Sequence, residues 1–251
     1  MHYPAAAMMF TRRAFVPEFM DAPDIDREEL REALRFIRRV NARLGGSAAC
    51  LGWLERLSRT WPRQRPIRIL DVGTGSADIP LAIVRWAKRR GRIVHIVAVD
   101  NHTTTLGLAA EFLAKERGSG SSDGSSIELV EADALKLLER FEPGSFDVAH
   151  AGMFMHHLPD IEIVTALRIL QRLAPGAVIW NDLVRDAISR VAIRILTVGT
   201  PPKVRHDAVV SVAKGFTRME AMDLARRAGL ERAAVRRHLF GRFTLIAPVP
   251  E

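Results

Sequence analysis

An apolar strand, a glycine-rich turn and an amphipathic helix follow one another directly in residues 67–90, IRILDVGTGSADIPLAIVRWAKRR. The run IRILDV is short, rich in Ile and Val, and ends at a turn, as a buried strand does. IPLAIVRWAKRR has the apolar spacing of an amphipathic helix. In an open α/β sheet, ligands bind at the carboxyl ends of the strands, where this turn would lie. Because Gly73 and Gly75 let a ligand approach the backbone closely, the sequence predicts a ligand-binding turn.

The alternation of strand and helix continues along the chain. Further strands are predicted over 93–100, 127–133, 146–152 and 177–182, with helices over 103–117 and 160–173. Such alternation is typical of a parallel sheet with helices on both faces. AAVRRHL and RFTLIAPV, late in the sequence, predict a closing pair of strands. We therefore expect an α/β fold: a Rossmann-like, seven-stranded, mostly parallel sheet with an N-terminal helical lid and a C-terminal antiparallel hairpin.

Helices are also predicted on either side of the sheet-forming region. Residues 26–44 carry Leu30, Leu34, Ile37, Val40 and Leu44 on one helical stripe, and a second helix is expected over 48–59. After the fifth strand, an amphipathic helix is predicted over 186–198, an irregular segment over 199–216, and a helix over 217–230 that begins with a Thr217–Glu220 capping box.

Composition narrows the function classes. Cys50 is the single cysteine, which excludes internal disulfides and a multi-thiolate zinc site and favours a reducing, cytoplasmic setting. No apolar run approaches the roughly 20 residues of a membrane-spanning helix. The net charge of +8 raises the question of nucleic acid as a partner. However, 32 of the 37 basic residues are arginine and they are spread over several segments, which is more typical of GC-rich coding than of a phosphate-binding surface.

The glycine turn also restricts the ligand. A dinucleotide-binding turn, G-x-G-x-x-G/A, places a small residue where this chain has Asp78. A carboxylate at the helix start would repel a diphosphate, so the turn suits a ligand without phosphates. Asp78 itself has two interpretations: it faces an ammonium group of the ligand, or it only stabilises the helix N-terminus.

Residues 67–182 resemble the class I S-adenosylmethionine-dependent methyltransferases. Their first motif, acidic-x-G-x-G-x-G, reads here as Asp71 to Ala77, with alanine at the third glycine. The resemblance implies that Asp100, at the end of the second strand, accepts hydrogen bonds from both ribose hydroxyls, and that Asp133 contacts the adenine amino group. The cofactor-binding residues that it implies are Asp71, Gly73, Thr74, Gly75, Asp100, Asn101, Asp133, Ala134 and Ala151.

A wider but less specific resemblance covers most of the chain. PEFMD, RVNARLGG, HHL, NDLVR and RHDAVVSVAKGFT are together similar to small-molecule methyltransferases related to ubiquinone/menaquinone biosynthesis and polyketide pathways. The expected function is metal-independent O-methylation of a phenolic or polyketide-type hydroxyl. The alternatives are C-methylation of a quinone-type ring and a non-catalytic binding module; RNA methylation is less favoured. Three regions are expected: a tail and helical lid over 1–60, an S-adenosylmethionine-binding core over 61–182, and acceptor-side elements with the closing strands of the same domain over 183–251.

Histidines are the candidate proton acceptors, because histidine titrates near neutral pH. His156 and His157 follow the fourth strand; one of two adjacent side chains is expected to face the site, with His157 favoured and His156 second. His206 is a competitor on the segment after the fifth strand. The candidate acceptor-binding residues are Met153, Arg185, Asp207 and Arg242. The fourth strand ends without a carboxylate, so no metal is expected. We expect a small-molecule partner and a monomer or homodimer.

Overall fold

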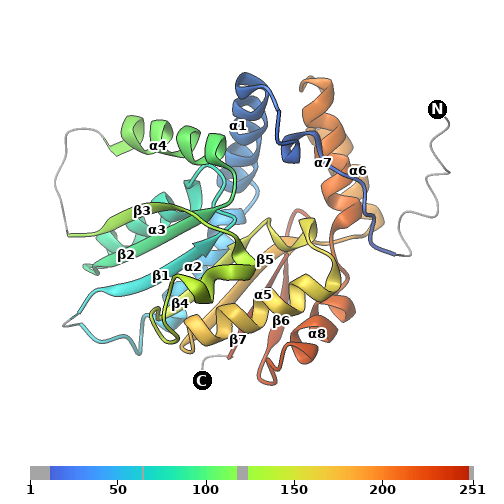
Figure 1. Ribbon diagram of the computed structural model, residues 1–251. Helices are drawn as coiled ribbons and strands as arrows, with labels where there is room; N and C mark the ends of the chain where they lie inside the picture. Colours follow the sequence, from blue (N-terminus) through green and yellow to red (C-terminus); the bar gives the residue numbers. More distant parts are fainter. Residues whose placement is uncertain (1–11, 64, 118–123, 249–251) are drawn as a thin grey trace.

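Seven strands form one sheet in the order β3-β2-β1-β4-β5-β7-β6 in the computed structural model, which describes residues 12–63, 65–117 and 124–248 (Figure 1). The five strands β1 to β5 are parallel, whereas β7 runs antiparallel to both β5 and β6. This confirms the predicted mostly parallel sheet with a closing antiparallel pair. The strands are β1 Ile67–Val72, β2 Val94–Asp100, β3 Ser126–Glu131, β4 Val148–Gly152, β5 Ala177–Leu183, β6 Ala234–His238 and β7 Arg242–Ala247.

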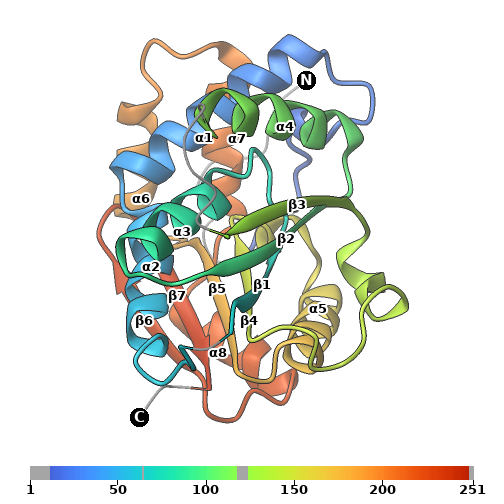
Figure 2. The same cartoon turned by 90° about the vertical axis from the view of Figure 1, so that its left-hand side faces the viewer.

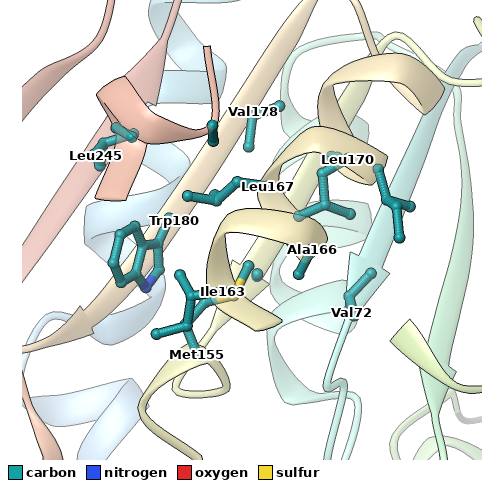
Figure 3. Packing of buried hydrophobic residues seen from close by; sticks show 14 of the residues in the cluster. Val72, Met155, Ile163, Ala166, Leu167, Leu170, Val178, Trp180 and Leu245 are labelled. Atoms are coloured by element: carbon teal, nitrogen blue, oxygen red, sulfur yellow. The ribbon is translucent and has the colours of Figure 1, made fainter. Parts of the chain in front are cut away.

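Helices cover both faces of the sheet, because its central strands are apolar on both sides. On one face, Ile163, Ala166, Leu167 and Leu170 of α5 pack against strand residues such as Trp180 (Figure 3). On the other face, α2 and α3 contribute a second cluster around Trp53, Leu54, Ile83 and Trp86. The helices are α1 Arg27–Arg43, α2 Gly46–Leu57, α3 Asp78–Arg89, α4 Thr103–Arg117, α5 Asp160–Leu173, α6 Ala187–Leu196, α7 Pro202–Lys214 and α8 Arg218–Arg227, with short 3-10 helices η2 Phe19–Asp21, η3 Ala134–Glu139 and η4 Met155–His157.

The strand order opens a crevice beside the glycine turn. The chain runs outward from β1 to β2 and β3, and then continues at β4 on the other side of β1. The helices that follow β1 and β4, α3 and α5, pack on opposite faces of the sheet. The loops after these two strands therefore diverge at their carboxyl ends, which is where ligands bind in open α/β sheets.

Helices α1, α4 and α7, which are far apart in the sequence, cover this crevice. Figure 2 shows α1 and α7 at the end of the sheet where the glycine turn lies, together with α4. Helix α1 contacts α7 and η2, and α7 contacts η4. The apolar stripe of α1 buries Leu30 and Leu34 against Leu108 of α4. The predicted helical stripe thus faces the covered side of the crevice.

The region after β5 departs from one expectation and confirms another. The expectation of an irregular segment over 199–216 is wrong, since α7 occupies Pro202–Lys214. Pro202 stands at the first helical position, where a missing N–H costs nothing, so the proline pair starts a helix instead of breaking one. The apolar side of α6 is present as predicted, but it is exposed: Ile188 is 74% and Ile195 67% exposed. Among the described residues, we find no helix with the length and apolar character needed to span a membrane.

Candidate functional site

The glycine turn adopts the left-handed backbone that its residues permit. Gly73 and Gly75 have φ values of +67° and +54°. A Cβ atom added to Gly73 would lie 2.6 Å from Phe154, so the ring of that residue packs directly against the turn. The amide nitrogen of Gly75 donates to Oδ2 of Asp100 over 3.0 Å. The turn is therefore held open and fixed to the end of β2.

Asp100 lies in a cavity at the ends of β1, β2 and β3. Its Oδ1 accepts from the amide of His102 over 3.1 Å, and burial raises the pKa of its carboxyl group. Each carboxylate oxygen can accept more than one hydrogen bond, so both keep acceptor capacity toward the cavity. Predicted residues gather here, because the walls include Gly73, Asp100, Asn101, Asp133, Ala134 and Phe154.

A second cavity adjoins the first and is strongly acidic. Gly73, Asp100, Asn101 and Phe154 line both, and the predicted residues Asp71, Thr74, Gly75 and Met153 line the second. Oδ1 of Asp71 lies 2.6 Å from Nδ1 of buried His150. Asp78 accepts from Nδ2 of Asn41 and from Oγ of Ser76, each over 3.0 Å, and burial raises its pKa. The carboxylates of Asp71, Asp78 and Asp100 therefore lie beside the glycine turn, and that of Asp71 is paired with His150, whose pKa is raised to about 10.

A third cavity lies over the carboxyl end of β5 and is mainly apolar. It shares Met20, Ile37, Met153 and His157 with the second cavity. Its apolar walls come from α1, α6 and α7, with Leu183 of β5. Its polar residues are Glu18, His156, His157, Asp207, Ser211 and Arg242. The three cavities thus adjoin one another at the carboxyl ends of the strands, with shared lining residues.

The two histidines of the HHL motif both line the third cavity. The expectation that only one faces the site is wrong, because they lie on the 3-10 helix η4. A 3-10 helix has three residues per turn, so neighbouring side chains point about 120° apart. In an extended strand they would point to opposite sides. The ring centroids of His156 and His157 are 4.2 Å apart.

His156 is held by a buried carboxylate. Its Nδ1 lies 2.7 Å from Oδ1 of Asp182 on β5, and its amide donates to Oδ2 of the same residue over 3.2 Å. Burial alone would raise the pKa of Asp182, but the charge and hydrogen bond of His156 lower it. The opposite ring nitrogen, Nε2, is 3.8 Å from Oε1 of Glu18. This pairing fixes the orientation of the His156 ring at the cavity wall.

His157 has a different environment. Its Nδ1 lies 2.8 Å from Oδ2 of Asp21 and 3.5 Å from Nζ of Lys214. Burial would lower the pKa of His157, but the hydrogen bond with Asp21 and the charges of Glu18 and Asp21 raise it. The imidazole therefore retains its proton to a higher pH than an ordinary histidine.

The remaining predicted residues lie away from the cavities or have structural contacts. His206 packs edge-on against Phe19, with ring centroids 4.8 Å apart, and does not line the third cavity. Asp207 reaches the cavity wall, but its carboxylate accepts from the amides of Phe19 and Met20. Arg185 is buried against the carbonyl of Gly215 and the carboxylate of Glu220. Ala151 is buried in the sheet core.

Several residues at the site carried no predicted role. Nζ of Lys214 donates to Oε1 of Glu18 over 2.9 Å, and both side chains are buried. Arg13 reaches back to the carbonyls of His156 and Lys214 and stacks over Phe216. The sequence gives no local signal for these contacts, because the partners lie more than 140 positions apart. The segments PEFMD and VAKGFT, which contain Glu18 and Lys214, stood out only through the wider resemblance.

Glu18, His156 and His157 also have the donor atoms of a metal site, which lie within 4.8 Å of one another. The ammonium group of Lys214 contacts Glu18 and lies beside His157. A cation of the protein itself therefore already neutralises this carboxylate.

Comparison with known proteins finds a family that the core of the chain is similar to. Residues 69–176 match a family described as "Methyltransferase domain". The ubiquinone/menaquinone biosynthesis C-methyltransferase UbiE of Rhizobium leguminosarum bv. trifolii is 35% identical over 114 residues, which are 44% of this chain and 40% of that protein. The demethylmenaquinone methyltransferase of Thermus thermophilus is 33% identical over 135 residues, 53% of this chain and 54% of that protein. The chain thus matches only about half or less of the length of these relatives.

Solved structures show the same fold over more of the chain. PigF with SAH has a TM-score of 0.62 at 18% identity and covers 93% of this chain and 63% of its own. An S-adenosylmethionine-dependent methyltransferase from Aquifex aeolicus has a TM-score of 0.55 at 15% identity and covers 89% and 98%. Residues 69–176 are thus similar to methyltransferase domains, including those of quinone-biosynthesis enzymes, and the chain has the fold of S-adenosylmethionine-dependent methyltransferases of known structure.

Proposed function

We propose that this protein transfers a methyl group from S-adenosylmethionine to a hydroxyl group of a small-molecule acceptor. The observation that carries the proposal is the row of three adjoining cavities. The first two are polar and contain carboxylates, and the third is mainly apolar and has a histidine oriented by Asp182 in its wall. The first two cavities suit the cofactor and the third suits the acceptor.

The residues of the first two cavities fit the cofactor chemically. Asp100 retains acceptor capacity for ribose hydroxyls, and Asp133 and Asn101 offer polar groups beside an adenine ring. The carboxylate of Asp78 offers opposite charge to an ammonium or a sulfonium beside the glycine turn, whereas Asp71 is paired with His150. S-adenosylmethionine, when bound, supplies an electrophilic methyl group on a cationic sulfur.

His156 is the residue that we assign as general base, with His157 as the neighbouring polar group. Asp182 holds Nδ1 of His156, which leaves Nε2 to accept the proton of an acceptor hydroxyl in the third cavity. The acceptor oxygen would bond to the methyl carbon as the sulfur–carbon bond breaks, and its proton would pass to Nε2. The raised pKa of His157 makes it a poorer proton acceptor at neutral pH.

C-methylation of a quinone-type ring is the second candidate. Two of the relatives are a C-methyltransferase and a demethylmenaquinone methyltransferase, and the same base would serve both reactions. Removal of a proton from a ring hydroxyl also makes the adjacent ring carbon nucleophilic. NMR of the methylated product distinguishes the candidates, because a methoxy carbon and a ring-methyl carbon have different chemical shifts.

Cofactor binding is the first test. Calorimetry with S-adenosylhomocysteine should show binding to the wild type and a loss of at least about tenfold in Asp100→Ala, on the scale of one or more charge-assisted hydrogen bonds. Asp147→Ala is the matched control, since that carboxylate binds Arg65 at the far end of β1. Absence of binding to the wild type would sink the proposed function.

Turnover is the second test, with acceptors found by a mass-spectrometric screen of phenols and quinols. His156→Gln and Asp182→Asn should each lower kcat about 10²–10⁴-fold, the usual contribution of general base catalysis, without changing cofactor affinity. The loss of kcat should become smaller as the pH approaches the pKa of the acceptor hydroxyl. His206→Gln, outside the cavity, is the control. Unchanged turnover in both site variants would remove His156 from the mechanism.

A further inference from the structure

Arg242 is a buried cation at the wall of the acceptor cavity. It begins β7, pairs with Leu183 of β5, and is 1% exposed. Leu183 lines the same cavity, together with apolar residues of α1 and α7. A guanidinium group in such surroundings has lost most of its contact with water, so its hydrogen-bond partners decide whether its burial is favourable.

The hydrogen bonds of Arg242 are incomplete. Nη2 donates to Oδ1 of Asn41 over 2.9 Å, whereas buried Nη1 has no partner among the described residues. Within the described part of the chain, no carboxylate forms a salt bridge with Arg242. Burial lowers the pKa of Arg242 to about 10, which leaves it a cation at neutral pH. An unpaired donor on a buried charge is destabilising.

The other residues of the cavity wall indicate which kind of group would complete the hydrogen bonds of Arg242. Lys214 binds Glu18 of this wall, whereas Arg242 forms no salt bridge within the described residues; the charges of Asp182 and Asp78 act on Arg242 without a hydrogen bond. Guanidinium groups bind carboxylates through paired N–H donors. We propose that the methyl acceptor carries, besides its reacting hydroxyl, a carboxylate that binds Arg242. This inference rests on the proposed function and narrows its substrate class to hydroxy acids with an apolar or aromatic body.

The contacts of Arg242 also reach the cofactor side. Asn41 of α1 accepts from Arg242 through Oδ1 and donates through Nδ2 to Asp78, which lines the second cavity. Asn41 is itself buried. An acceptor carboxylate bound to Arg242 would therefore be connected, through the side-chain amide of Asn41, to the carboxylate of Asp78 at the start of α3.

The test compares acids with neutral molecules of the same shape. Calorimetry with full-length protein saturated with S-adenosylhomocysteine would use 2-, 3- and 4-hydroxybenzoate and the matching hydroxybenzamides. At least one acid should bind the wild type ten or more times more tightly than its amide. Arg242→Met should remove this preference and Arg242→Lys should retain part of it. Arg205→Met, which changes an exposed arginine of α7, should leave it intact.

If Arg242→Met does not fold, the comparison of acids with amides on the wild-type protein still tests the inference. If none of the three acids binds the wild type more tightly than its amide, the inference is overturned, and it is also overturned if Arg242→Met folds and keeps the preference. In either case, S-adenosylhomocysteine binding and methylation of a neutral phenol would leave the proposed function standing. Failure of the wild type to bind S-adenosylhomocysteine would instead remove the proposed function itself.

Discussion

The hydrogen bond between His157 and Asp21 should make part of the stability depend on pH. The raised pKa of His157 means that folding favours its protonated form. The contribution of this hydrogen bond to stability is therefore fully present below pH 6.5, the pKa of histidine in the unfolded chain. It is lost as the pH rises through the higher pKa of His157 in the folded protein. Since both side chains are partly exposed, we expect His157→Gln to lower the free energy of unfolding by about 0.5–1 kcal/mol at pH 5.5 and by less at pH 8.5.

Urea denaturation of wild type and His157→Gln at the two pH values measures this difference. His95→Gln is a suitable control, because His95 lies in β2, outside the walls of the three cavities, and its Nδ1 contacts Oγ of Ser126. A difference that grew with pH would show that His157 is stabilised in its neutral form.

Lys214 should decide whether the histidine cluster binds metal. Its ammonium neutralises Glu18, so treatment with EDTA should leave wild-type turnover unchanged. Lys214→Met would free Glu18, His156 and His157 to act as one carboxylate and two imidazole ligands, a set that zinc accepts. We expect that variant to bind Zn²⁺ in calorimetry and to lose activity when zinc is added. Wild-type activity that fell with EDTA and returned with a divalent ion would contradict this assignment.

The sequence predicts which residues meet where a short motif marks the end of a strand. Gly73, Asp100 and Asp133 line one cavity because each lies at or just after the carboxyl end of a strand, and parallel strands bring these ends together. Glu18 and Lys214 could not be found in this way. Their contact depends on how η2 and α7 pack together, and no periodicity in the sequence records that packing.

At the scale of elements, α1 should behave as a cover that the sheet does not require. Leu30 and Leu34 form a small cluster with Leu108, apart from the two main clusters on the sheet. Removing residues 1–44 should therefore leave a cooperatively folding domain. It should also weaken S-adenosylhomocysteine binding at least tenfold, because Leu34, Ile37 and Asn41 line the second cavity.

Thermal unfolding and calorimetry on the shortened chain would check both expectations. Arg13→Ala in the full chain controls for loss of the N-terminal contacts alone. An insoluble product would mean that α1 belongs to the folding core, and unchanged affinity would remove its role as a cover.

Element-level prediction failed where tertiary packing overrides local signals. The segment over 199–216 is predicted to be irregular, but Pro201 and Pro202 lie at a helix start, and α7 is then stabilised by buried Val204, Val210 and Val212. The pattern of α6 predicted its helix correctly, yet periodicity alone could not tell whether the apolar side is covered.

At the scale of the whole molecule, one group of arginines lies away from the acceptor cavity. A groove between α1 and α3 is lined by Arg35, Arg38, Arg39, Arg43, Arg85 and Arg89. We expect a short oligouridine to bind this groove through its phosphates only. Its apparent affinity should fall about tenfold or more between roughly 50 and 200 mM salt, as for other electrostatic complexes.

Fluorescence anisotropy across that salt range measures the affinity, and mass spectrometry of the recovered RNA tests for methylation. Arg39→Ala with Arg89→Ala should weaken retention without affecting turnover of a small acceptor. Binding that resisted salt, or methylated RNA, would restore nucleic acid as a substrate.

The position of β7 has a consequence for the order in which the protein becomes functional. It is the last described strand in the sequence, yet it lies inside the sheet between β5 and β6. On the ribosome, the glycine turn and β1 to β5 emerge well before β7, so the edge of β5 waits unpaired for its partner. Arg242 arrives with that strand. A nascent chain would therefore have its cofactor-side residues in place before it acquires the residue assigned to the acceptor carboxylate, and the ability to select an acceptor would be the last property gained during synthesis.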